Sequence, residues 1–94
     1  MDREIPAEVS NIITKLENAG FEAYIVGACV RDLLLEREPE DWDVATQAKP
    51  EEVRALFPDN FYENKFFTVT VLTESKNPKL KEIEVTTFRS DMKY

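Results

Sequence analysis

The chain has 94 residues, of which 43% are hydrophobic and 33% are charged, and its formal net charge at pH 7 is −7. This composition indicates one folded globular domain and excludes a disordered or fibrous chain. With a single cysteine and no histidine, an intramolecular disulfide, a Cys/His metal cluster and a histidine base are also excluded.

The first third of the chain predicts a helix followed by a strand. Apolar residues recur at helical spacing over residues 6–19, with Pro6 suited to the first turn and Gly20 to the position just after the helix. The run FEAYIVG is short and mostly apolar, and it ends at Gly27. We therefore expect a strand that is buried on both faces.

Two more helices and three more strands are predicted from the rest of the sequence. A short helix follows the glycine turn, with three residues on one side, namely Val30, Leu33 and Leu34. Pro39 and Pro50 flank a strand at about 41–45, and PEEVRALFP predicts a third short helix. The segments FFTVTVLT and EIEVTTFR are β-branched and alternating, so they predict an antiparallel hairpin around ESKNPK.

The order helix, strand, helix, strand, helix, strand, strand indicates an α/β (α+β) domain with a mixed sheet and at least one antiparallel pair. Buried Trp42 and a small, buried Cys29 are expected in its core. The same core position is expected for most other aromatic residues, namely Phe61, Tyr62, Phe66, Phe67 and Phe88.

Three acidic residues are candidates for a metal site. Asp41 and Asp43 are two apart on a predicted strand, so both carboxylates leave one face while Trp42 leaves the other. Two carboxylates so close repel each other, so the pair needs a cation or a raised pKa to coexist. Mg²⁺ would neutralise both charges with oxygen ligands alone. Glu84 would face the pair if the two strands are neighbours. The alternative is a solvated acidic strand face.

The segment between the first strand and the second helix is a candidate phosphate site. Gly27 would let backbone N–H groups face an anion, although many such turns use glycine for geometry alone. Arg31, one turn into the helix, would either reach a phosphate with its planar guanidinium or pair with Asp32 or Glu36 on the surface.

Two separated motifs carry a resemblance to a known family. VGACVRDLLLEREPEDWDVAT resembles the head-domain signature of the class II tRNA nucleotidyltransferases (CCA-adding enzymes) and bacterial poly(A) polymerases, in which G-G-x-V-R-D is followed by a D-x-D strand. IEVTTFRSDMKY is similar to the next strand of that family, so the resemblance covers roughly residues 6–94. It implies a nucleotidyltransferase (polymerase beta-like) fold.

The resemblance also implies an activity and its residues. It implies transfer of CMP or AMP from CTP or ATP to the 3′ end of tRNA, with Mg²⁺ as cofactor and pyrophosphate as leaving group. By position, Asp41 and Asp43 are similar to the metal ligands, and Glu84 lies where a supporting catalytic carboxylate would sit. The segment that holds the triphosphate corresponds to Gly27, Ala28, Arg31 and Asp32.

The sequence departs from the family pattern at three glycine positions. Ala28 replaces the second glycine of the pair, Glu36 replaces the glycine before Arg37, and Phe67 precedes the T-V strand. We expect residues 1–94 to be a head domain, as a fragment or split subunit without neck, body and tail domains. Because the chain is acidic, we expect those domains or a partner chain to make most of the contacts with tRNA.

Two alternative functions remain open. One is a non-catalytic binding or partner module that keeps the fold, and the other is a nucleotidyltransferase acting on an acceptor other than tRNA. The first residues lack a signal peptide pattern, and no apolar run is long enough to cross a bilayer. We therefore expect a cytoplasmic protein without a membrane partner.

Overall fold

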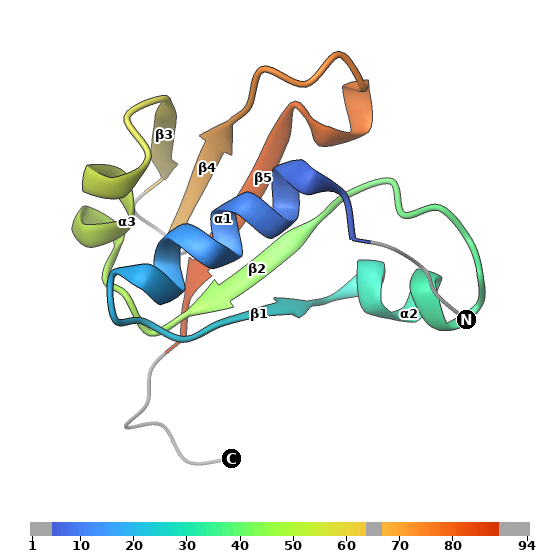
Figure 1. The fold of residues 1–94 in the computed structure, drawn as a ribbon, viewed down its shortest axis with the longest axis horizontal. Coiled ribbons are helices and arrows are strands. Elements are labelled where there is room, and N and C mark those ends of the chain that lie inside the picture. The colour runs from blue at the N-terminus through green and yellow to red at the C-terminus, as the bar shows by residue number, and fades with distance from the viewer. Residues whose placement is uncertain (1–4, 64–66, 89–94) are drawn as a thin grey trace.

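The computed structural model describes residues 5–63 and 67–88, and in this part of the chain three α-helices accompany a five-stranded sheet (Figure 1). The elements in chain order are α1 (Ala7–Asn18), β1 (Ala23–Val26), α2 (Ala28–Leu34), β2 (Asp43–Thr46), α3 (Pro50–Leu56), β3 (Asn60–Glu63), β4 (Thr68–Leu72), the 3-10 helix η2 (Pro78–Leu80) and β5 (Glu82–Thr87). The predicted α/β class and mixed sheet are confirmed. None of the helices in these ranges is long and apolar enough to cross a membrane.

The sheet has the strand order β1-β2-β5-β4-β3. Strands β2 and β5 are parallel, whereas the other neighbouring pairs are antiparallel. The predicted hairpin of β4 and β5 is therefore confirmed. Strand β3 was not predicted, because it has only four residues and follows the turn-forming pair Pro58 and Asp59.

Helices α1 and α3 lie over one face of the sheet, and the core forms between them (Figure 1). Val9, Ile12 and Leu16 are the buried side of α1, as its helical spacing predicts. They meet the inward side chains of the central strands, which are Val44, Val69, Val71, Ile83 and Val85. Because side chains alternate along a strand, Asp43 and Glu84 point to the face that these helices leave open.

Both α1 and α2 end in the same backbone motif. Gly20 follows α1 with a φ of 96°, and Glu36 follows α2 with a φ of 60°. After each, the amide of the next residue donates to the carbonyl five positions earlier, at 3.0 Å for α1 and 2.8 Å for α2. Phe67 also has a positive φ, of 52°. Two of the three positions where glycine was expected therefore keep a backbone that favours glycine.

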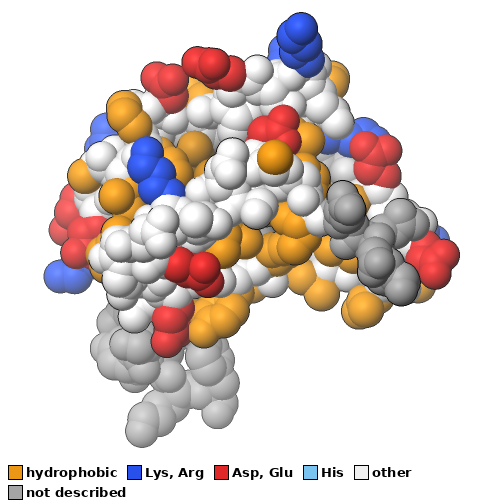
Figure 2. Space-filling view, in the orientation of Figure 1, with side chains coloured by type: hydrophobic (Ala, Val, Ile, Leu, Met, Phe, Trp, Pro, Cys, Tyr) orange, Lys and Arg blue, Asp and Glu red, His pale blue; other side chains and the backbone are white. Residues whose placement is uncertain are grey.

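One expectation about burial was wrong. Strand β1 is not buried on both faces, because it is an edge strand with Tyr24 52% exposed. Helix α2 lies beyond the end of β1, where it buries Cys29 in the core and leaves Val30 and Leu34 exposed. Figure 2 accordingly shows apolar side chains exposed along the edge that β1 and α2 form.

The expected core positions of the aromatic residues are confirmed only in part. Trp42 is 4% exposed and belongs to the core, and Tyr62 packs partly buried against it. Phe88 is half-buried, and its ring lies 6.3 Å from that of Tyr24. The expectation that Phe61 and Phe67 belong to the core is wrong, because both side chains are nearly half exposed on peripheral segments. Phe66 lies outside the described residues.

Candidate active site

The sheet places Asp43 directly beside Glu84. Strands β2 and β5 are parallel neighbours in which Asp43 pairs with Glu84, and β4 places Thr70 on the other side of Glu84. The sequence left this contact conditional on the two strands being neighbours, and the register confirms it. Two carboxyl groups from distant parts of the sequence are thus adjacent on the open face of the sheet.

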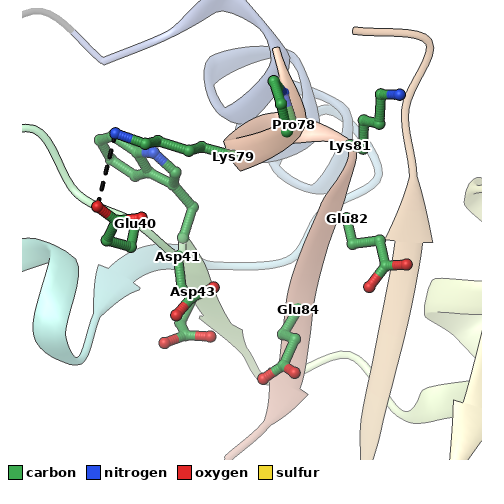
Figure 3. A pocket seen from close by; sticks show the side chains of 9 residues that line it. Glu40, Asp41, Asp43, Pro78, Lys79, Lys81, Glu82 and Glu84 are labelled. Atoms are coloured by element: carbon green, nitrogen blue, oxygen red, sulfur yellow. Dashed lines mark ion pairs between the residues drawn. The ribbon is translucent and has the colours of Figure 1, made fainter. Parts of the chain in front are cut away.

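Asp41 joins them from outside the strand. Strand β2 begins at Asp43, so Asp41 lies in the preceding segment rather than on the predicted strand 41–45. Buried Trp42 anchors this segment in the core, and its carbonyl accepts a hydrogen bond from the amide of Glu84 at 3.3 Å. Figure 3 shows the carboxyl groups of Asp41 and Asp43 on the same side, with Glu84 reaching toward them from β5.

The surroundings of Asp43 raise its pKa. Burial of the carboxyl group is the largest cause, and the negative charge of Asp41 raises the pKa further, whereas a hydrogen bond with the side chain of Glu84 lowers it. Asp43 therefore sits where its negative charge is unfavourable without a cation. Such a pKa shift is typical of residues at functional sites.

Gly27 closes the other side of Asp43. It links β1 to α2 with a φ of 84°, and a Cβ atom built there would lie 2.9 Å from Oδ2 of Asp43. Only glycine satisfies both the backbone conformation and the close approach. Beneath it, the thiol of Cys29 donates to the carbonyl of Val26 at 3.0 Å, and burial raises the pKa of this thiol. Cys29 is thus a core residue, as expected.

The remaining residues of the predicted phosphate segment, Ala28, Arg31 and Asp32, follow Gly27 on helix α2. Ala28 is the first residue of α2 and is exposed, so its methyl group meets no obstacle in the helix. The Arg31 side chain is 67% exposed and its guanidinium lies 3.5 Å from the carboxylate of Asp32. The surface pair considered from the sequence is therefore present. Arg31 and Asp32 do not line the cavity beside Asp43.

A cavity of about 530 Å³ opens beside the three carboxylates (Figure 3). Glu40 and Glu82 also line it, as do Lys79 and Lys81 from the connection between β4 and β5. The Nζ of Lys79 lies 3.5 Å from Glu38 and 3.6 Å from Glu40. The sequence did not single out these two lysines, because ESKNPK signals a turn but not the direction in which the following side chains point.

The donor atoms of this cavity fit a hard divalent cation. Within residues 5–63 and 67–88, no three Asp, Glu, Cys or His side chains converge into a preformed metal site. Mg²⁺ is commonly held by one or two carboxylates together with waters and substrate phosphates, so it does not need such a cage. Asp41 and Asp43 provide this kind of pair, and Glu84 supports Asp43 through its hydrogen bond.

Comparison with known proteins agrees with this geometry. A family model described as the poly A polymerase head domain matches residues 23–94. The chain is 46% identical over 92 residues to a CCA-adding enzyme of Lactobacillus delbrueckii subsp. bulgaricus, and the match covers 97% of this chain and 22% of that protein. It is 51% identical over 55 residues to poly(A) polymerase I of Haemophilus influenzae, which covers 58% of this chain and 12% of that protein.

Solved structures show the same likeness. The Bacillus stearothermophilus CCA-adding enzyme in complex with CTP superposes with a TM-score of 0.76 at 44% identity, over 87% of this chain and 20% of that chain. The chain thus spans about a fifth of the length of these CCA-adding enzymes. Nucleotidyltransferases of this kind generally depend on a divalent metal ion. Fold, site and sequence agree, and the chain belongs to the poly A polymerase head-domain family.

Proposed function

We propose that this chain is the catalytic head of a template-independent RNA nucleotidyltransferase that adds CMP or AMP to the 3′ end of tRNA. The observation that carries the proposal is the junction of Asp41, Asp43 and Glu84 beside a cavity, with Gly27 against Asp43. In the proposed reaction the 3′-hydroxyl group releases its proton to solvent and its oxygen bonds to the α-phosphorus of CTP or ATP. The bond from that phosphorus to the β-phosphate oxygen breaks, and pyrophosphate leaves.

Each residue of the site has a role in this proposal. Asp41 and Asp43 hold Mg²⁺, which when bound would stabilise negative charge on the reacting phosphates. Glu84 fixes the orientation of Asp43 through their hydrogen bond. Gly27 and Ala28 leave room for the triphosphate at the start of α2, and Arg31 exchanges Asp32 for a phosphate oxygen.

Most of the contacts that bind tRNA are proposed to lie outside residues 1–94. Nucleic-acid affinity rests largely on lysine and arginine contacts to phosphates, and this chain carries 19 acidic against 12 basic residues. The CCA-adding enzyme relative that it matches is more than four times as long. Further domains or a second chain would therefore hold the tRNA, while this head supplies the reacting site.

Thermal unfolding with ligands tests the proposal. Mg²⁺ with CTP or ATP at ten times the dissociation constant should stabilise the chain by about 1.4 kcal/mol, which raises the unfolding midpoint by roughly 5 to 10 °C. Asp41→Asn should abolish this rise. Asp59→Asn is the matched control, because Asp59 is an exposed carboxylate that does not line the cavity.

The result decides between the proposal and its main alternative. A rise that needs both metal and nucleotide, and that only Asp41→Asn removes, supports a nucleotidyltransferase site. If neither Mg²⁺ nor either nucleotide changes the midpoint of the wild-type chain, the fold serves as a non-catalytic binding or partner module instead.

A further inference from the structure

Lys79 and Lys81 are the basic side chains that line the carboxylate cavity, as far as residues 5–63 and 67–88 describe it. We propose that they bind the phosphate backbone of the acceptor RNA strand next to its reacting 3′ end. The proposal rests on the proposed function, because it assigns the acceptor side of that same site. It adds two binding residues that neither the family motifs nor the carboxylate pattern indicates.

The arrangement of the residues around Asp43 indicates from which side the acceptor strand approaches. Gly27 and helix α2 lie on the β1 side of Asp43, and Glu84 lies on the β5 side. In phosphoryl transfer the attacking oxygen and the leaving oxygen lie roughly in line across the phosphorus. If the triphosphate lies against Gly27 and α2, its pyrophosphate leaves on that side. The acceptor must then approach from the β5 side, where η2 carries Lys79 and Lys81 follows it.

Charge makes a basic contact necessary on that side. Five acidic side chains line the cavity, namely Glu40, Asp41, Asp43, Glu82 and Glu84. A phosphodiester group that enters such a cavity is repelled unless positive charge offsets the carboxylates. Asp41 and Asp43 would hold a divalent cation that offsets their own charge, which leaves Glu82 and Glu84 facing the acceptor. Lys79 and Lys81 line the same cavity and supply that charge at its mouth.

The backbone of Lys79 is held in place, whereas its ammonium group can exchange one partner for another. Its backbone amide donates to Oδ1 of Asn77 at 3.0 Å, and the neighbouring Leu80 is buried. Its Nζ pairs only at 3.5 Å and 3.6 Å, with Glu38 and Glu40, whose side chains are 67% and 76% exposed. Exposed ion pairs of this kind contribute little to stability, so a phosphate can replace them.

Lys81 is available without any exchange. Within the described part of the chain, its side chain makes no hydrogen bond or ion pair. In Figure 3 its ammonium group points away from Glu40 and toward β4, whereas that of Lys79 points toward Glu40. The two charges therefore lie at opposite sides of the cavity mouth. An extended strand that crosses the mouth would meet both.

The test is a titration of the chain with a short RNA. A single-stranded RNA hexamer with a free 3′-hydroxyl is added to the ¹⁵N-labelled chain in the presence of Mg²⁺, and chemical shifts give the dissociation constant at several salt concentrations. The double variant Lys79→Ala/Lys81→Ala is compared with Lys49→Ala/Lys76→Ala. The control pair removes the same charge from exposed lysines that do not line the cavity.

The expected result is a loss confined to the cavity lysines. The cavity variant should bind the hexamer at least about five-fold more weakly than the control variant, and its slope of log K against log salt should be smaller by about 1.4, or about 0.7 per lost contact. Its stabilisation by Mg²⁺ and CTP should equal that of the wild-type chain.

Three results would overturn the inference. They are equal salt slopes in the two variants, no binding of the hexamer by the wild-type chain, or loss of the Mg²⁺ and CTP response in the cavity variant, which would place the lysines on the nucleotide. Failure of the proposed function is distinct from these, because there the wild-type chain itself shows no response to Mg²⁺ and CTP.

Discussion

A Cβ atom on Gly27 would lie 2.9 Å from Oδ2 of Asp43. This distance links the turn after β1 to the metal-binding carboxylate proposed on β2, which is 16 residues later in the sequence. Real Cβ atoms essentially never come so close to another heavy atom, so a side chain at position 27 must displace the carboxylate. The turn and the acidic strand therefore form one structural unit.

Gly27→Ala is expected to lower both stability and ligand binding. The left-handed φ and the collision together should lower the free energy of unfolding by about 1 to 3 kcal/mol, and the displaced Asp43 should reduce the effect of Mg²⁺ and CTP on the midpoint. Gly20→Ala is the matched control, because Gly20 has a φ of 96° but no heavy atom within 4 Å of its Cβ position.

The comparison separates strain from collision. Gly20→Ala should lower stability through strain alone and leave the ligand response unchanged. If the two variants respond to Mg²⁺ and CTP equally, the contact between Gly27 and Asp43 has no role in binding.

Glu36→Gly is expected to stabilise the chain. Glu36 has a φ of 60° at the end of α2, the position that Gly20 occupies at the end of α1. Glycine adopts this conformation without the clash of a Cβ atom, so the free energy of unfolding should rise by about 1 kcal/mol. Chemical denaturation measures the change. Glu36→Ala is the control, since it removes the same side chain but keeps the Cβ atom, and a gain of the same size there would refute the backbone explanation.

The central carboxylates could be predicted from the sequence, but the surroundings that position them could not. Alternation along EIEVTTF places Glu84 on the outward face, and Ile83 and Val85 are indeed buried. The contact between Glu84 and Asp43 needs β2 and β5 to be parallel neighbours, and local propensity does not give strand order. The motif resemblance identified the carboxylates without identifying this register.

Burial was harder to predict than element type, because burial depends on what lies against each element. FEAYIVG has the composition of a central strand, yet β1 lies at the sheet edge and exposes Tyr24. The side of α2 that carries Leu34 is apolar, but no described element covers it. Lys79 and Lys81 enter the cavity only because the connection between β4 and β5 folds back through η2.

Asp43→Asn is expected to stabilise the metal-free chain at pH 7. Burial raises the pKa of Asp43, so the folded chain binds this proton more tightly than the unfolded chain does. As the pH rises from the unfolded pKa through the folded pKa, ionisation lowers the free energy of unfolding, and above the folded pKa that loss is complete. The asparagine variant lacks the loss, so its midpoint at pH 7 should be higher, while the two midpoints should converge near pH 3.

The same substitution should abolish stabilisation by Mg²⁺ with CTP, so that stability and binding change in opposite directions. Midpoints at pH 3 and pH 7, with Asp59→Asn alongside, measure both effects. An asparagine variant that is less stable than the wild-type chain at pH 7 without metal would instead mean that the carboxylate makes hydrogen bonds which the amide cannot replace.

Arg31→Ala is expected to weaken nucleotide binding while leaving the fold unchanged. The Arg31 side chain is 67% exposed and, among residues 5–63 and 67–88, it pairs with Asp32 alone, at 3.5 Å, so the free energy of unfolding should change by less than about 0.5 kcal/mol. Arg54→Ala is the converse control, because the Nε of Arg54 donates to Asn60 at 3.0 Å and its guanidinium lies over the ring of Tyr62. That variant should lose stability and keep the nucleotide response.

The response of the Arg31 variant to Mg²⁺ and CTP also tests where the triphosphate lies. A smaller rise in the midpoint, partly restored in Arg31→Lys, would place the triphosphate against α2, since lysine keeps the charge but not the planar pair of donors. A rise equal to that of the wild-type chain would mean that Arg31 does not contact the nucleotide. The assignment of the opposite side, with Lys79 and Lys81, to the acceptor strand would then lose the orientation on which it depends.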